Sequence, residues 1–183
     1  AIPVAVNIFA PLYMDPSLPS LIRRALDQRG MTGERQLCVE ITEHLLVDDL
    51  AQARTVLQTI RADGIGVALD DFGSGYAALS YLRELPIDQV KLNSDFIAAV
   101  LSFSRAATLV KAVIDLAHHL DVAVVAGGIE NAETAARLRE FGCDLGQGFY
   151  HSPPISAPAV VDLLTRTRAA SPPRTAQLSP GTR

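Results

Sequence analysis

The sequence predicts an α/β fold in which helices cover a parallel sheet, and three observations point to it. Short runs rich in β-branched residues alternate with longer amphipathic runs along residues 1–168. The short runs are nearly all apolar, as is usual for strands that are buried on both faces. Each of them is followed by a helical pattern, which is the order of elements in a βαβ unit.

Six runs are predicted as strands. In chain order they cover residues 3–8, 37–42, 67–70, 89–92, 122–126 and, with a weaker pattern, 143–145. Their length of three to six residues is typical of strands in such sheets.

The segments between the strands carry apolar residues at steps of three and four, which predicts helices. One such stripe consists of Leu46, Leu50, Ala53, Leu57 and Ile60. A second stripe consists of Leu109, Val113, Leu116 and Leu120. Asp15 followed by Pro16 supplies an N-cap and a first-turn proline for a helix over residues 18–26, and Gly30 follows as a stop.

Length limits the number of these units. About six strand–helix units are present, whereas a closed barrel needs eight units and about 250 residues. We expect residues 1–168 to form one domain. Residues 169–183 are rich in Pro, Ser, Thr and Arg, and we expect them to be a disordered tail.

Composition excludes several classes of protein. The net charge of −4, from 16 basic and 20 acidic residues, argues against a protein that binds DNA or another polyanion. No stretch approaches about 18 uncharged apolar residues, so no membrane span is expected. The first residues lack the features of a signal peptide and begin in mid-strand, like a cut edge. Cys38 and Cys143 are predicted as buried thiols of a cytoplasmic protein.

Polar residues stand at the ends of successive predicted strands. They are Asn7, Glu40, the pair Asp70 and Asp71, Lys91 and Gln147. A single strand-end carboxylate is more often a helix cap or a solvated charge. As a set, however, these groups would meet, because the carboxyl ends of parallel strands converge on one face. Carboxylate and amide oxygens suit Mg²⁺, Mn²⁺ or Ca²⁺, and adjacent aspartates can serve two metals that activate water against a phosphodiester.

The ordered motifs resemble those of EAL-domain cyclic-di-GMP phosphodiesterases, over roughly residues 4–154. The motifs are Val6-Asn7-Ile8, Glu40-Ile41-Thr42-Glu43, Asp70-Asp71-Phe72-Gly73-Ser74-Gly75-Tyr76, Lys91-Leu92, Gly128-Ile129-Glu130 and Gln147-Gly148. The resemblance implies a modified (β/α)8 barrel of TIM type, here lacking its first strands. It also implies a cytoplasmic protein of bacterial cyclic-di-GMP signalling, whose family uses two Mg²⁺ or Mn²⁺ ions to convert cyclic-di-GMP to pGpG.

The resemblance also implies roles for single residues. The positions that match metal ligands are Asn7, Glu40, Asp70 and Asp71. Lys91 matches the lysine that contacts the attacking water, and Gln147 matches a late active-site glutamine. Glu43 matches the glutamate that braces the loop after Asp71. In the family this loop lies beside a dimer interface, so we expect a homodimer in which Phe72 and Tyr76 supply apolar bulk.

The sequence departs from the family pattern in three places. The Glu-Ala-Leu motif is absent before Asn7, and with it a metal ligand, an arginine that grips phosphate and two strands. Either the chain is a fragment or the gene begins late. Gly127 stands where the family has a glutamate, its proposed general base or a metal ligand, and a general base contributes about 10²–10⁴ in rate. Asn93 replaces an aspartate and removes a charge beside Lys91.

These departures predict a non-hydrolytic or very weakly active EAL-family protein with a weakened metal site. The alternative is a working metal-dependent phosphodiesterase of which this chain is a fragment. A chain without catalysis would sense cyclic-di-GMP or contact another protein, whereas a decayed fragment would expose unpaired strand edges.

Overall fold

The chain is described from a computed structural model, which covers residues 3–8, 12, 15–31, 36–42, 50–73, 78–98, 100–101 and 105–170. It divides into two compact units, Ala1–His151 and Ser152–Arg183.

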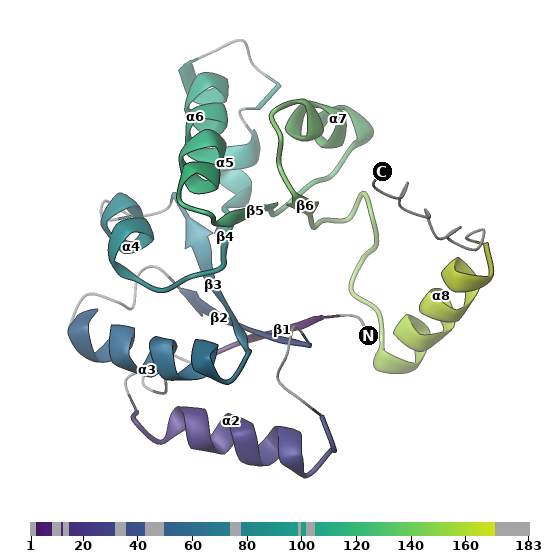
Figure 1. The fold of residues 1–183 in the computed structure, drawn as a ribbon. Helices are drawn as coiled ribbons and strands as arrows, with labels where there is room; N and C mark the ends of the chain where they lie inside the picture. The colour runs from purple at the N-terminus through teal and green to yellow at the C-terminus, as the bar shows by residue number, and fades with distance from the viewer. Residues whose placement is uncertain are drawn as a thin grey trace, which may run out of the picture. The chain divides into compact units, whose positions relative to one another are not determined.

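The first unit is built on a parallel sheet of six strands (Figure 1). These are β1 (Val4–Asn7), β2 (Leu37–Thr42), β3 (Gly66–Phe72), β4 (Gln89–Leu92), β5 (Ala123–Ala126) and β6 (Leu145–Gly146). Their order in the sheet is their order in the chain, and every neighbouring pair is parallel. This order, with helices in the connections, is the winding of a β/α barrel.

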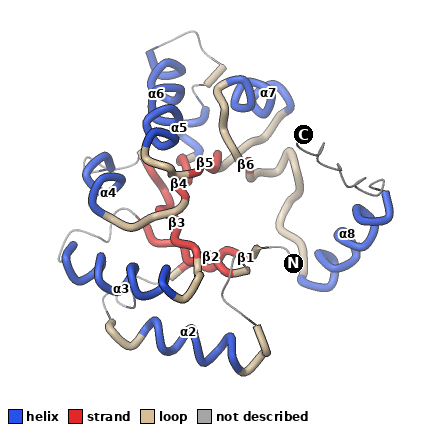
Figure 2. The backbone as a smooth tube through the Cα atoms, viewed as in Figure 1, coloured by secondary structure: helices blue, strands red, loops and turns tan. Residues whose placement is uncertain are grey.

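Helices lie around the outside of the curled sheet (Figure 2). They are α2 (Leu18–Asp27), α3 (Leu50–Ala62), α4 (Ala78–Glu84), α5 (Ser94–Ala98), α6 (Arg105–His119) and α7 (Ala132–Glu140). The second unit contains α8 (Ala157–Ala170). The predicted tail overlaps the last two residues of α8, and its remainder, residues 171–183, lies outside the described residues.

The core lies between the sheet and the helices, and the strand pleat explains its composition. Successive side chains of a strand point to opposite faces, so alternate residues face the helices. On the helix-facing side the buried residues are Val39, Ile41, Val67, Leu69, Val90, Leu92, Val124 and Ala126. They form one cluster with apolar residues of the helices. The opposite face of the sheet carries the polar side chains of Glu40, Asp70 and Lys91 beside smaller apolar ones such as Ala68 and Val125.

Helix α6 was predicted correctly, but its buried face was not. Leu109, Leu116 and Leu120 of the predicted stripe are 53%, 40% and 44% exposed. The buried residues of α6 are instead Ala107, Val110, Val113, Ile114 and Ala117. The helix has apolar residues on two faces, and the periodicity does not choose between them. The face with small and β-branched residues packs on the sheet.

Asp88, which precedes β4, ties the start of its neighbouring strand in place. Its Oδ2 accepts a hydrogen bond of 2.9 Å from the backbone N–H of Val67 in β3. Arg61, in the last turn of α3, donates to the same carboxylate, with Nη2 at 2.7 Å from Oδ1. One side chain thus joins the start of a strand to the end of the preceding helix.

Asp144, which precedes β6, repeats this arrangement two strands further along the sheet. Its Oδ2 accepts a 2.8 Å hydrogen bond from the backbone N–H of Val124 in β5. The partner from the last turn of the preceding helix is His118, with Nε2 at 2.8 Å. We call Asp88 and Asp144 the amino-end aspartates, because both act at the starts of the strands.

Candidate functional site

Strand register and ion pairs bring four of the predicted site residues together at the carboxyl ends of neighbouring strands. Asn7, the last residue of β1, is paired with Glu40 of β2, and Thr42 of β2 is paired with Asp70 of β3. Lys91 of β4 reaches both carboxylates, with Nζ at 2.9 Å from Glu40 Oε2 and 3.2 Å from Asp70 Oδ1. The carboxyl ends of adjacent strands therefore share one charged cluster, as the sequence predicts.

The charge of Lys91 is maintained by its two partners. Burial by itself lowers the pKa of Lys91, because it disfavours the charged ammonium. The hydrogen bond to Glu40 and the negative charge of Asp70 outweigh burial, so the pKa of Lys91 is raised above its ordinary value. Lys91 is thus an ammonium ion at neutral pH and supplies the positive charge that its two carboxylates require.

Asp70 and Asp71 lie in an irregular part of β3. Leu69 pairs with Val90 and Phe72 pairs with Leu92, so three steps on β3 face two on β4. This extra residue is a β-bulge, a feature that re-aims side chains at the ends of sheets. Asp71 has the left-handed φ of 63°, and its backbone N–H donates a 2.9 Å hydrogen bond to Asp70 Oδ1.

The bulge gives the two adjacent aspartates different partners. Asp70 contacts Lys91, whereas the carboxylate of Asp71 accepts a hydrogen bond from the side-chain amide of Asn93. The sequence singled out Asn93 as a lost charge beside Lys91, and did not predict its contact with Asp71. The signal available was the Asn-x-Asp spacing at the start of α5, where Asn93 Oδ1 accepts the N–H of Asp95 at 2.7 Å.

Gly127 directly follows β5, beside the end of the strand that carries Lys91. Its backbone N–H donates a 3.1 Å hydrogen bond to the carbonyl of Leu92. A Cβ atom at this position would lie 3.1 Å from the same carbonyl oxygen. The end of β5 therefore contributes backbone but no acid or base from this residue.

Gln147 follows β6, and its backbone pairs with Ala126 at the end of β5. Its side chain is exposed, as is that of Asn7. Both residues thus stand at the expected end of the sheet. Glu43 lies outside the described residues, as do residues 74–77 of the loop after Asp71.

The oxygen donors present have the right chemistry for a divalent metal but are not arranged as a metal site. Among the described residues, no group of three His, Cys, Asp or Glu side chains is placed to hold a metal ion. Glu40 and Asp70 are engaged by the Lys91 ammonium, and Asp71 by the Asn93 amide. To serve a two-metal centre of the kind that the motifs imply, these carboxylates would have to give up contacts to Lys91 and Asn93.

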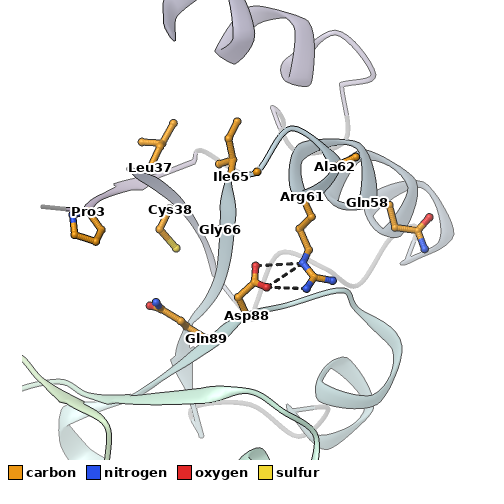
Figure 3. Close-up of a pocket in the computed structure, with 11 residues that line it drawn as sticks. Pro3, Leu37, Cys38, Gln58, Arg61, Ala62, Ile65, Gly66, Asp88 and Gln89 are labelled. Carbon is orange, nitrogen blue, oxygen red and sulfur yellow. Dashed lines mark hydrogen bonds and ion pairs between the residues drawn. The ribbon is translucent and has the colours of Figure 1, made fainter. Parts of the chain in front are cut away.

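A cavity of about 890 Å³ lies at the other end of the strands (Figure 3). Its lining includes Cys38, Gln89 and the ion pair of Arg61 with Asp88. Burial, with a smaller effect of the Glu40 charge, raises the pKa of the Cys38 thiol to about 11. A protonated thiol is a poor nucleophile, and the charged groups satisfy each other, so this cavity is not a candidate catalytic site.

Fold and site together define a β/α-barrel domain with an acidic cluster and a lysine at the carboxyl ends of its strands. The family model of the EAL domain matches residues 1–154, and the chain belongs to this family. The family and the barrel class that the motifs predict, with about six β/α units, are confirmed.

Curated relatives support the same family. The chain is 37% identical over 171 residues to "Cyclic di-GMP phosphodiesterase NbdA" of Pseudomonas aeruginosa, which spans 93% of this chain and 22% of that protein. It is 36% identical over 152 residues to "Signaling protein YkoW" of Bacillus subtilis, spanning 83% of this chain and 19% of that protein. The chain thus spans about a fifth of the length of these relatives.

Solved structures agree in fold. The EAL domain of Mycobacterium smegmatis DcpA superimposes with a TM-score of 0.85 at 33% identity, covering 90% of this chain and 74% of that one. Klebsiella pneumoniae BlrP1, solved as a manganese and cyclic-di-GMP complex, has a TM-score of 0.74 at 30% identity, covering 80% and 38%. Within the described residues, no helix is long and apolar enough to cross a bilayer.

Proposed function

We propose that this chain is an EAL-domain module of cyclic-di-GMP signalling that has lost all or nearly all hydrolytic activity. The observation that carries the proposal is Gly127, which directly follows β5, next to the Lys91 strand, and has no acidic side chain. A water molecule at the site would lack a proton acceptor from this position. The loss of a positioned general base reduces the rate by about 10²–10⁴.

Charge balance at the strand ends supports the same proposal. We propose that Lys91 contacts the nucleotide phosphate or the attacking water. Glu43 is proposed to brace the loop after Asp71, and Gln147 to be a late active-site residue. In the structure the Lys91 ammonium is already neutralised by Glu40 and Asp70. A phosphate would have to compete with both carboxylates for it, which weakens electrostatic stabilisation of a developing phosphate charge.

Metal binding by this chain is proposed to be weak. BlrP1, which is similar in fold to this chain, was solved as calcium and manganese complexes with cyclic-di-GMP. Here Asn7, Glu40, Asp70 and Asp71 are the proposed ligands for Mg²⁺ or Mn²⁺. Recruiting Glu40, Asp70 and Asp71 as ligands competes with their contacts to Lys91 and Asn93, and that cost lowers the affinity.

Association, location and domain extent follow the same proposal. We propose a domain over residues 1–168, located in the cytoplasm, that forms a homodimer through the loop after Asp71 or binds a protein partner. Phe72 cannot supply the apolar bulk predicted for that interface, because it lies in the core and is only 2% exposed. Tyr76 lies outside the described residues.

A turnover assay tests the proposal. Purified chain is incubated with cyclic-di-GMP and Mn²⁺ or Mg²⁺, and pGpG is measured by chromatography. We expect no conversion by the unmodified chain, and only partial activity for Gly127→Glu, with Gly127→Glu/Lys91→Ala as the inactive control. A rate near 1 s⁻¹, at the lower end of ordinary enzyme turnover of roughly 1–10³ s⁻¹, would establish the alternative of a working phosphodiesterase.

A binding assay separates the two non-catalytic functions. Equilibrium dialysis of labelled cyclic-di-GMP against the chain, with and without Mn²⁺, measures nucleotide retention directly. Retention without hydrolysis is the expected result for a sensor. Failure to bind at millimolar nucleotide would leave the protein-contact function.

A further inference from the structure

Asn93 is held in one orientation by both ends of its side-chain amide. Its Oδ1 accepts the backbone N–H of Asp95 at 2.7 Å, at the first turn of α5. The amide nitrogen is thereby directed to the other side, where it donates to the carboxylate of Asp71. Its backbone is fixed as well, because its N–H donates to the carbonyl of Phe72 at 3.1 Å.

The residue that Asn93 contacts is strained. A non-glycine residue in the left-handed region costs about 1–3 kcal/mol and persists only where its surroundings hold it there. Asp71 has this conformation at the bulge of β3. The Asn93 amide binds its side chain, while Asp70 Oδ1 accepts its backbone N–H. Asn93 therefore helps to fix the direction of the Asp71 carboxylate.

We propose that Asn93 is a positioning residue that keeps the Asp71 carboxylate on an amide and thereby lowers the divalent-metal affinity of the strand ends. The inference rests on the proposed weak metal site and explains part of its weakness. The amide N–H occupies Oδ1 of Asp71, so a cation that binds through this oxygen, or through both oxygens, competes with that hydrogen bond. A carboxylate at position 93 has no such donor. Two facing carboxylates are relieved by a shared cation.

The test is Mn²⁺ binding to Asn93→Asp in the absence of nucleotide, measured as free Mn²⁺ by electron paramagnetic resonance. We expect Asn93→Asp to bind Mn²⁺ at least about tenfold more tightly than the unmodified chain, a change of about 1.4 kcal/mol. Ala98→Asp is the charge-matched control, because Ala98 is exposed at the end of α5. We expect it to change the affinity less than about twofold, since a screened surface charge contributes little.

Two further variants keep the outcome interpretable. Asn93→Ser retains an oxygen for the Asp95 N–H but is too short to hold Asp71, so we expect a smaller gain in Mn²⁺ affinity. Asn93→Asp/Asp71→Asn should return the affinity to that of the unmodified chain or below. Circular dichroism confirms that each variant is folded.

Equal Mn²⁺ affinity for the unmodified chain, Asn93→Asp and Asn93→Ser would overturn the inference, as would an equal gain for Ala98→Asp. Absence of Mn²⁺ binding in every variant would overturn it too. The comparison of Mn²⁺ affinities does not depend on turnover. If the turnover assay showed hydrolysis by the unmodified chain, the proposed function would be wrong, but the comparison of Mn²⁺ affinities would still test the role of Asn93.

Discussion

Lys91 on β4 and Glu40 on β2 are joined by a hydrogen bond of 2.9 Å, although strand β3 lies between their strands in the sheet. Their side chains are only 13% and 9% exposed. Such a pair is mutually dependent, because either charge left alone in a partly buried position loses both its solvation and its counter-charge.

Removing the lysine should therefore destabilise the fold. We expect Lys91→Met to lower the free energy of unfolding by about 2–3 kcal/mol at pH 7, slightly below the range for a fully buried pair because Asp70 is partly exposed. Urea denaturation followed by circular dichroism measures the loss. Lys91→Met/Glu40→Gln should recover part of it, and a double variant less stable than Lys91→Met would contradict the interpretation.

Gly127 and Gly128 should respond differently to alanine. A Cβ at position 127 would lie 3.1 Å from the Leu92 carbonyl oxygen, a contact that needs a shift of a few tenths of an ångström. A Gly→Ala change also lowers the conformational entropy of the unfolded chain, which stabilises the fold by about 0.4–1 kcal/mol. The two effects oppose each other, so we expect Gly127→Ala to change the free energy of unfolding by less than about 1 kcal/mol. Gly128 has a φ of 72°, and its Cβ would lie 2.5 Å from Ser94 Cβ.

For Gly128→Ala we thus expect a loss of more than about 1 kcal/mol, from the left-handed backbone alone. Thermal unfolding of both variants provides the measurement. If Gly127→Ala lowered thermal stability more than Gly128→Ala, the structure would have no room for a side chain at position 127. The expected result means instead that a side chain can be placed at position 127.

The buried face of α6 can be checked with two substitutions on the same helix. Ile114 is fully buried, and Ile114→Ala should cost about 2–4 kcal/mol through lost burial and the cavity that remains. Leu116 is 40% exposed, so Leu116→Ala should lower the free energy of unfolding by less than about 1 kcal/mol. Similar losses for the two in urea denaturation would favour the leucine stripe that the periodicity predicts.

Asp144 should make the free energy of unfolding depend on pH in the acidic range. Burial alone raises the pKa of its carboxyl, but the Val124 N–H and His118 outweigh it, so the pKa of Asp144 lies below its ordinary value. A lowered pKa contributes stability above the unfolded value of about 3.9, and this is lost as the pH falls through the folded value. We expect unmodified chain to be more stable than Asp144→Asn at pH 6.

As the pH falls below the unfolded value and through the lowered folded pKa of Asp144, the two unfolding free energies should converge, because the carboxyl becomes protonated in the folded chain as well. Urea denaturation at a series of pH values provides the comparison. A difference that stays constant from pH 6 to pH 3 would show that charge on Asp144 has no part in it.

Much of the fold could be predicted from the sequence, because buried parallel strands and helices have distinct apolar periods. The strands at residues 37–42 and 89–92 were predicted with their observed bounds. The convergence of Glu40, Asp70 and Lys91 followed from the parallel order alone. These are properties of local pattern and topology.

The remaining features depend on geometry that no local pattern contains. The bulge in β3 separates the partners of Asp70 and Asp71, and it arises from the pairing of β3 with β4. The contact of Asn93 with Asp71 follows from that pairing, 22 residues apart in sequence. The choice between the two apolar faces of α6 likewise depends on how closely the helix approaches the sheet.

The amino-end aspartates suggest how a chain of this kind can change its chemistry and keep its shape. Asp88 and Asp144 fasten strands to helices at the starts of β4 and β6, whereas Gly127 and Asn93 stand past the far ends of the strands. Substitutions at the far ends leave these fastenings untouched. Catalytic activity can therefore be lost in evolution while the fold is retained. A domain of this kind can then still bind a ligand or a protein partner.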